Sequence, residues 1–275
     1  MKTAYFDCIS GASGDMLLGA LLDAGLPLQA LEAELAKLHL DDFHLHVGKV
    51  IKNAFSATKV DVHAHDHAPE RHLRELRAVI EDSHLSDHIK DRAVRVFTRI
   101  CGVEAGIHGM DIEDVHLHEV GGVDAIIDVV GVLAGVDLLG LEHIVVSPLP
   151  MGRGFIEAAH GRIPLPAPAT LGLLAGVPVY GVPIAAELVT PTGAALLVEL
   201  ADAWGQLPAM TLRGIGYGAG TRDLAIPNVL RLLLGEKSSG GPWLSETITE
   251  LETHLDSDTG ETIGHAMHKL LDAGA

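Results

Sequence analysis

The sequence predicts an α/β fold, with α+β as the alternative, in which a mixed sheet packs against helices. Apolar residues make up 48% of the 275 residues, with alanine, valine, leucine and glycine prominent, whereas aromatic residues make up only 4%. Short apolar runs also alternate with segments of helical spacing. This balance is typical of buried strands covered by helices and argues against an aromatic-rich β-sandwich.

The first half of the chain alternates strand and helix signals. A short run of strand-forming residues comes first, and a Gly-Leu-Pro corner then separates two segments of helical spacing. Two alternating segments on either side of Lys52-Asn53 are typical of a hairpin, and two later segments have polar outer faces typical of surface helices. The expected strands span 3–6, 44–50 and 57–62, and the expected helices span 15–23, 28–38, 71–82 and 87–105.

The second half opens with the most apolar stretch, residues 125–141. Asp128 and Asp137 interrupt it, so we expect a buried helix and not a membrane span. Residues 148–168 are rich in glycine and proline, which predicts a loop-like segment that is largely extended. The remaining expected elements are strands at 143–146 and 210–215 and helices at 170–174 and 193–204.

Composition divides the chain into two domains. Residues 1–236 are expected to form the first, and residues 237–244, which contain Lys-Ser-Ser-Gly-Gly-Pro, form a linker. Residues 245–275 predict a strand at 247–252 and a helix at 261–271. Because a strand and a helix cannot close a core alone, we expect this part to be the start of a truncated α+β domain.

Charge and cysteine content limit the class of protein. The formal net charge of −18 argues against nucleic acid or an anionic membrane as the main partner and is compatible with handling cations. Cys8 and Cys101 are too few for a disulfide framework, so we expect a cytoplasmic location. Cys8 is expected to be a small buried residue and not a thiolate ligand. No targeting segment is expected, because Asp7 introduces a charge before an apolar signal core forms.

Five of the 17 histidines form two clusters. The first cluster is His63, His65 and His67, whose alternate spacing points successive rings the same way on an extended backbone. Neutral imidazole suits Ni, Zn and Cu, so a metal is the first ligand to suspect, although a solvated strand end gives the same pattern. Six other histidines are expected to be surface or core groups: His39, His44, His46, His84, His88 and His143.

The second cluster, His116 and His118, runs into three carboxylates. Glu119 follows directly, and Asp124 and Asp128 share one face if their segment is helical. This density of ligand groups exceeds what a packed core needs and predicts a metal site. The alternative is a helix entry that places Glu119 in its first turn.

Four loops have further chemical potential. Residues 7–15 join a strand to a helix. Backbone N–H groups at the helix start favour an anion, and Asp7 and Asp15 favour a cation. The alternative is a tight strand–helix turn with Ser13 as the helix cap. The loop lacks the lysine of a Walker A motif, so an ATPase is not expected. Residues 187–193 place Thr190 and Thr192 at a helix start, for phosphate binding or simple capping.

The other two loops are rich in glycine or proline. Residues 214–220 contain four alternate glycines, which resemble a dinucleotide-binding fingerprint. The amphipathic helix that follows such a fingerprint is missing here. The remaining interpretation is a loop that contacts a ligand, with Arg222 and Asn228 nearby. His160-Gly-Arg162 opens a proline-rich loop, and its imidazole and guanidinium suit a substrate anion.

Six motifs follow one another in order between Met1 and about Arg231. They are Asp7-x-x-Ser-Gly-x-Ser-Gly-Asp15-Met, His116-x-His-Glu-Val-Gly-x-Val-Asp124, Ser147-Pro-Leu-Pro-x-Gly-x-Gly154, His160-Gly-x-x-Pro-x-Pro-Ala-Pro168, Glu187-Leu-Val-Thr-Pro-Thr-Gly193 and Gly216-Tyr-Gly-Ala-Gly-Thr-x-Asp223. Together they resemble the LarC family of nickel insertion proteins. Residues 252–261 are similar to the opening of the family's second domain, which usually has Asn-Ile-Asp-Asp there.

The resemblance implies a cyclometallase of the lyase class. Such an enzyme inserts Ni²⁺ into pyridinium-3,5-bisthiocarboxylic acid mononucleotide and makes the nickel-pincer cofactor of lactate racemase. It would use CTP with Mg²⁺ or Mn²⁺, which the family associates with its C-terminal domain. The implied partners are the mononucleotide and that C-terminal domain, with no nucleic acid and no membrane, and a homo-oligomer is left open.

Candidate roles follow from these motifs and clusters. The expected catalytic residues are Asp15, His118 and Glu119. The expected substrate-binding residues are Ser13, Gly14, His160, Arg162, Thr190, Thr192 and Arg222. The expected metal ligands are His63, His65, His67, His116, His118 and Asp124. We further expect the second histidine cluster, Glu119 and Asp124 to share one pocket with Asp7 and Asp15 at a sheet edge.

Two other functions fit the residues alone. One is a nickel-binding metallochaperone or storage module without chemistry, for which the first histidine cluster is sufficient. The other is a metal-dependent hydrolase, in which His116, His118 and Asp124 surround an activated water.

Overall fold

The computed structural model describes residues 1–40, 43–64, 71–115, 117, 122–158, 161–237, 252 and 256–274. Two compact units divide the chain, Met1–Ser238 and Ser239–Ala275.

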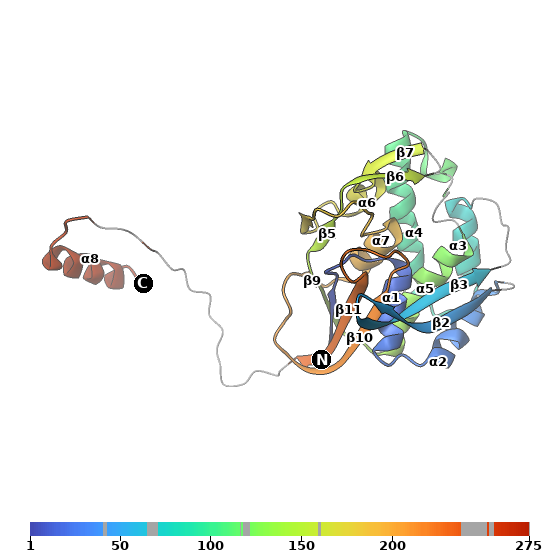
Figure 1. The fold of residues 1–275 in the computed structure, drawn as a ribbon, viewed down its shortest axis with the longest axis horizontal. Coiled ribbons are helices and arrows are strands. Elements are labelled where there is room, and N and C mark those ends of the chain that lie inside the picture. The colour runs from blue at the N-terminus through green and yellow to red at the C-terminus, as the bar shows by residue number, and fades with distance from the viewer. Residues whose placement is uncertain are drawn as a thin grey trace. The chain divides into compact units, whose positions relative to one another are not determined.

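A seven-stranded mixed sheet organises the first unit (Figure 1), which confirms the α/β prediction. Its order is β2-β3-β10-β11-β1-β4-β9. Central β1 pairs antiparallel with β11 and parallel with β4. The strands are β1 (Lys2–Asp7), β2 (Phe43–Lys52), β3 (Phe55–Ala64), β4 (His143–Val146), β9 (Ala203–Trp204), β10 (Met210–Ala219) and β11 (Val229–Lys237).

Helices pack beside this sheet and enclose the main core. Helix α1 contacts β10, β3 and α5, and α4 contacts α3, α5, α6 and α7. Helix α5 buries residues on every side, as expected of its nearly uninterrupted apolar sequence, and this confirms the buried helix. The helices are α1 (Gly14–Asp23), α2 (Leu28–Leu35), α3 (Leu73–Glu81), α4 (Asp87–His108), α5 (Val123–Leu138), α6 (Pro168–Leu173) and α7 (Pro191–Leu200), with short 3₁₀ turns at Ala36–Leu38 and Ile112–Asp114.

The glycine-dense segment 214–220 is mostly a strand, so the prediction that it forms a loop was wrong. It lies mostly in β10, where alternate glycines face α1. A Cβ on Gly218 would lie 1.8 Å from the carbonyl oxygen of Met16, and one on Gly216 would lie 2.2 Å from that of Ala20. The glycines therefore let a helix backbone approach the strand closely.

Three other segments differ from the sequence prediction. Strand β11 was not predicted, although it pairs with both β1 and β10. The segment 148–168 is extended as predicted, but its strands are paired: β5 (Leu149–Met151) with β8 (Val179–Gly181), and β6 (Gly154–Ala158) with β7 (Gly161–Leu165). The predicted helix 193–204 ends at Leu200, and Ala203–Trp204 forms an edge strand instead.

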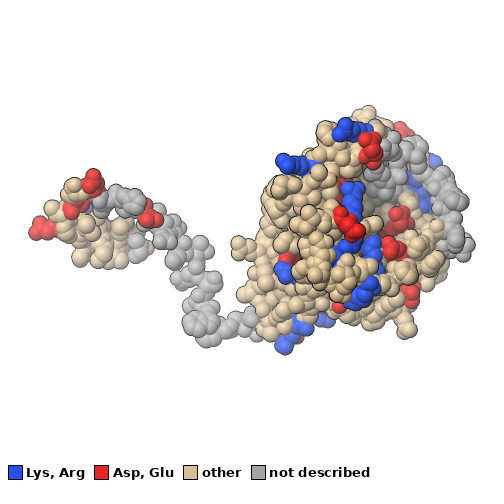
Figure 2. Space-filling view, in the orientation of Figure 1, with Lys and Arg blue, Asp and Glu red and all other residues tan. Residues whose placement is uncertain are grey.

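The second unit contains helix α8 (Gly260–Asp272), which confirms the predicted helix. The predicted strand at 247–252 and the linker lie almost entirely outside the described residues. Among the described helices, none combines the length and apolar character that a membrane crossing requires. On the face of the first unit in Figure 2, the described acidic and basic side chains are interspersed.

Candidate functional site

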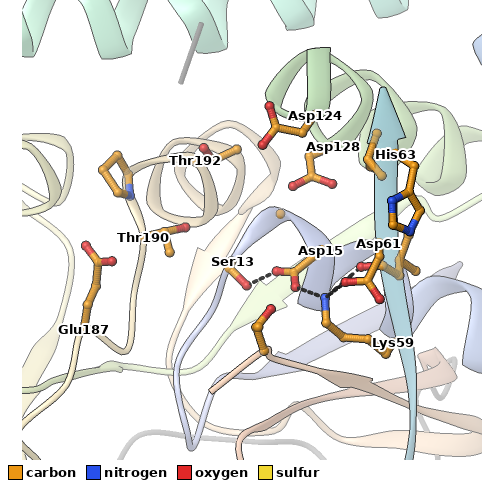
Figure 3. Close-up of a pocket in the computed structure, with 15 residues that line it drawn as sticks. Ser13, Asp15, Lys59, Asp61, His63, Asp124, Asp128, Glu187, Thr190 and Thr192 are labelled. Carbon is orange, nitrogen blue, oxygen red and sulfur yellow. Dashed lines mark hydrogen bonds and ion pairs between the residues drawn. The ribbon is translucent and has the colours of Figure 1, made fainter. Parts of the chain in front are cut away.

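A cavity of about 560 Å³ opens where the N-terminal ends of three helices meet β3. Figure 3 shows the side chains of α1, α5, α7 and β3 converging on it. The lining residues are Ser13, Gly14, Asp15, Lys59, Val60, Asp61, Val62, His63, Asp124, Asp128, Glu187, Thr190, Pro191, Thr192 and Thr221.

The start of α1 is built from small residues because it packs against α5. A Cβ on Gly14 would lie 2.4 Å from Oδ2 of Asp128, so only glycine fits there. Ser13 occupies the position before the helix, but its side chain makes no capping hydrogen bond. Its hydroxyl donates to Oδ1 of Asp15 instead. The serine therefore orients a carboxylate, and the capping interpretation of its side chain was wrong.

The start of α7 is fixed to the same loop. The backbone N–H of Thr190 donates to the carbonyl of Ala12 over 3.0 Å. The Thr190 side chain accepts from the backbone N–H of Gly193 over 3.2 Å, and Pro191 follows it at the first helical position. These contacts confirm Thr190 as a cap and bring the N-terminal ends of α1 and α7 together.

Lys59 links two carboxylates across the cavity. Its ammonium lies 2.8 Å from Oδ2 of Asp15 and 2.9 Å from Oδ1 of Asp61. Burial alone would lower the pKa of Lys59, but the two carboxylates outweigh it, so its pKa is raised. The lysine therefore remains charged and balances part of the acidic lining.

Asp128 lies at the back of the cavity, one turn along α5 from Asp124. Both carboxylates line the cavity, which confirms that they share one helix face. Among the described residues, Oδ1 of Asp128 is shielded from solvent and has no hydrogen-bond partner. Burial raises the pKa of Asp128 well above its ordinary value, and the neighbouring Asp15 and Asp124 raise it further. Asp128 therefore keeps its proton to a higher pH than an exposed aspartate does.

The structure brings seven of the expected site residues together at the cavity: Ser13, Gly14, Asp15, His63, Asp124, Thr190 and Thr192. Arg162 and Arg222 do not line it. The Arg162 guanidinium lies 4.6 Å from the centre of the Phe155 ring, and the Arg222 carbonyl accepts from Asn228 over 2.9 Å. Six expected residues lie outside the described residues: His65, His67, His116, His118, Glu119 and His160.

Asp7 was expected to share the pocket, but the structure gives it another role. Asp7 forms an ion pair with Arg231 and does not line the cavity. Cys8 is completely buried, and burial raises the pKa of its thiol, so the prediction of a small buried residue is confirmed.

Lys59, Asp61 and Glu187 were not identified from the sequence as site residues. Lys59, Asp61 and His63 alternate along β3, and alternate residues of a strand share one face. That pattern was a usable signal, because His63 was already a candidate ligand. Glu187 had only its place in the motif before Thr190 to indicate a role.

The cavity combines two kinds of binding chemistry. Helix N-terminal ends present backbone N–H groups and a positive dipole, which favour an anion such as phosphate. The carboxylates favour a cation and supply proton acceptors. Within the described ranges, no three His, Cys, Asp or Glu side chains form a preformed metal site.

Comparison with known proteins gives consistent results. Residues 4–275 match the family described as nickel insertion protein. The chain is 46% identical over 280 residues to the pyridinium-3,5-bisthiocarboxylic acid mononucleotide nickel insertion protein of Desulfitobacterium hafniense, with all of this chain and 69% of that protein covered.

The protein of the same name from Geobacillus kaustophilus is 45% identical over 293 residues, which cover all of this chain and 71% of that protein. No solved structure matches the chain. The family match spans nearly the whole chain and agrees with the resemblance to LarC, so this chain belongs to the nickel insertion protein family.

Proposed function

We propose that this chain inserts nickel into pyridinium-3,5-bisthiocarboxylic acid mononucleotide and that the cavity described above holds the precursor. Relatives that carry this activity in their names match the full length of the chain. The precursor is anionic at its phosphate and thiocarboxylates, and the cavity offers helix N-terminal ends beside carboxylates.

The phosphate is best accommodated between the starts of α1 and α7. Ser13, Thr190 and Thr192 line this part of the cavity, and two helix dipoles point their positive ends at it. Hydroxyl and backbone N–H donors at such a position bind an anion without requiring a cationic side chain. The pyridinium ring would then extend toward Asp15 and Asp128.

The single observation that carries the proposal is the buried carboxyl group of Asp128. Two Ni–S bonds form from the thiocarboxylate sulfurs, and one Ni–C bond forms from a ring carbon. The electron pair of the broken C–H bond becomes the Ni–C bond, and the proton must go to a base. Asp128 is the candidate for this base, because it is buried in the cavity and its Oδ1 has no hydrogen-bond partner among the described residues. Asp15 lies beside it.

Metal entry prepares this base. A divalent cation close to the carboxylates favours their ionised form, so nickel would release the proton that Asp128 otherwise keeps. Asp128 then accepts the ring proton, and Asp15, held by Ser13 and Lys59, orients the reacting group. The reaction belongs to the lyase class and depends on CTP with Mg²⁺ or Mn²⁺, as the LarC resemblance implies.

Nickel incorporation tests the proposal. The precursor, Ni²⁺ and CTP are incubated with the protein, and nickel-containing product is measured by mass spectrometry. Asp128→Asn should lower the rate by about 10²–10⁴-fold, the usual contribution of a positioned base, while precursor binding is retained. The matched control is Asp91→Asn, which changes an exposed aspartate on α4 and should keep the wild-type rate.

Other outcomes distinguish the alternatives. A full rate for Asp128→Asn would refute its role as the base. Nickel binding by the wild-type protein without product formation would favour a metallochaperone, and cleavage of a generic phosphoester would favour a hydrolase.

A further inference from the structure

Three imidazole rings lie close together on the β2–β3 hairpin. The ring centres of His44 and His63 are 5.2 Å apart, and those of His46 and His63 are 6.2 Å apart. All three residues are exposed. His63 was a candidate ligand from the sequence, whereas His44 and His46 were expected to have no ligand role.

The hairpin register creates this group. His44 pairs directly with His63, and His46 pairs with Asp61. Directly opposed residues of an antiparallel pair project from the same face. The opposite face of β2 carries Phe43, Leu45 and Val47, which pack on the core, so the alternation leaves the histidines exposed.

The ring separations match those of imidazoles that share one metal ion. A metal–nitrogen bond of about 2.1 Å and a ring radius of about 1.1 Å place each ring centre about 3.2 Å from the ion. Two rings on one ion are therefore at most about 6.4 Å apart. Both separations, 5.2 Å and 6.2 Å, fall within this limit.

The ring orientations differ from those of a bound state. His44 and His63 are stacked, with 23° between their planes, so their nitrogens do not yet converge. Exposed side chains change rotamer within picoseconds to nanoseconds, so the rings can turn toward an ion without backbone movement. Asp61, opposite His46, supplies a carboxylate on the same face.

The same strand face continues into the cavity. His63, Asp61 and Lys59 follow one another at alternate positions of β3, and all three line the cavity. The face therefore leads from exposed imidazoles to the carboxylates around Asp15. His63 and Asp61 supply an imidazole and then a carboxylate, donors that suit an ion that must be captured and then passed on, whereas the charged Lys59 is an ion-pair partner and not a ligand.

We propose that His44, His46 and His63 form an entry site that captures Ni²⁺ from solution, with Asp61 as the next ligand toward the cavity. The delivery step rests on the proposed function, because the cavity is its destination. The capture step does not, because it needs only the hairpin.

Nickel titration followed by calorimetry tests the capture step. The protein is titrated with Ni²⁺ alone, without precursor, as wild type and as the His44→Ala/His46→Ala variant. The variant should bind its tightest nickel ion at least about tenfold more weakly, since even groups that only support a ligand contribute that much. Unchanged affinity in the variant, or no nickel binding by the wild type, overturns the proposal.

His84→Ala is the matched control. The His84 ring lies 4.5 Å from that of His39, so it belongs to another close imidazole pair, but it does not line the cavity. Its removal should leave the nickel affinity unchanged, and an equal loss would show nonspecific binding to imidazoles and overturn the site.

Precursor binding in the absence of nickel separates the two proposals. If the wild-type protein fails to bind the mononucleotide, the proposed function fails while the nickel titration still decides the entry site. Circular dichroism of each variant verifies that the hairpin remains folded.

Discussion

Replacing Asp128 with asparagine should change how the stability of the protein depends on pH. The carboxyl group packs against the first turn of α1, where a Cβ on Gly14 would lie 2.4 Å from its Oδ2. Asparagine has the same shape as the protonated acid, so it fits the same space. The substitution therefore removes a titrating group with little change in packing.

The direction of the effect follows from the raised pKa. Burial, then Asp15 and Asp124, raise the pKa of Asp128 in the folded protein above its ordinary value of 3.8. The folded state thus holds the proton more tightly than the unfolded state. The resulting stability is fully present below the unfolded pKa and is lost as pH rises through the folded pKa.

One proton sets the magnitude. Between the two pKa values, the free energy of unfolding of the wild-type protein should fall relative to Asp128→Asn by about 1.4 kcal/mol per pH unit. Above the folded pKa of Asp128, the difference in the free energy of unfolding between the two proteins becomes constant. Asp128→Asn should therefore be increasingly more stable than the wild type as pH rises through this window.

Urea denaturation at a series of pH values from 4 upward measures this difference. Asp91→Asn, on the exposed surface of α4, serves as the control and should follow the wild-type curve. Parallel curves for the wild type and Asp128→Asn would refute the argument, because they would show that Asp128 titrates alike in the folded and unfolded states.

Three further predictions concern the fold. Gly218→Ala places a Cβ 1.8 Å from the Met16 carbonyl oxygen and should lower the free energy of unfolding by at least about 1–3 kcal/mol in urea denaturation. Asp23→Asn should destabilise the protein above pH 4. Burial alone would raise the pKa of Asp23, but hydrogen bonds from Lys49, Thr58 and the Tyr217 backbone outweigh burial and lower this pKa. The wild-type advantage therefore disappears as pH falls through the folded pKa of Asp23, which pH-dependent denaturation would detect. Glu199→Gln leaves three arginines of α4 without their shared carboxylate and should lower the melting temperature, less so at high salt; an unchanged melting temperature at both salt concentrations would contradict this.

Elements with a clear periodicity were predictable from the sequence. The four N-terminal helices and the hairpin have apolar residues at helical or alternate spacing, and the structure places them within a few residues of the expected positions. Strand β11 was not predictable in this way. Its run Val-Leu-Arg-Leu-Leu-Leu is buried on both faces, so it shows no alternation that separates a strand from a buried helix.

The entry site shows how much depends on one turn. The sequence indicated only that Lys52-Asn53 lies near the hairpin turn, and a turn centred on that pair would align His44 with Asp61. The observed turn is at Asn53 and Ala54, which both have positive φ, and it pairs His44 with His63. A shift of one residue at the turn moves the pairing by two residues, and only the structure fixes it.

The cavity was predictable where motifs mark helix starts and not where strands cross. Ser13, Gly14, Asp15, Thr190 and Thr192 belong to such motifs, and all of them line the cavity. The alternation with His63 places Lys59 on the same strand face, but no sequence pattern indicates that Lys59 reaches Asp15 on another element. The contact requires β3 and α1 to pack together, and a Cβ on Gly19 of α1 would lie 2.5 Å from the carbonyl oxygen of Thr58 in β3.

A crystal structure of the protein with the pyridinium mononucleotide bound would test most directly whether the cavity is the site of nickel insertion. We expect density for the phosphate at the N-terminal ends of α1 and α7, beside Ser13 and Thr190, and for the ring against Asp15 and Asp128. Density for the precursor elsewhere on the protein, with this cavity left empty, would contradict the proposal.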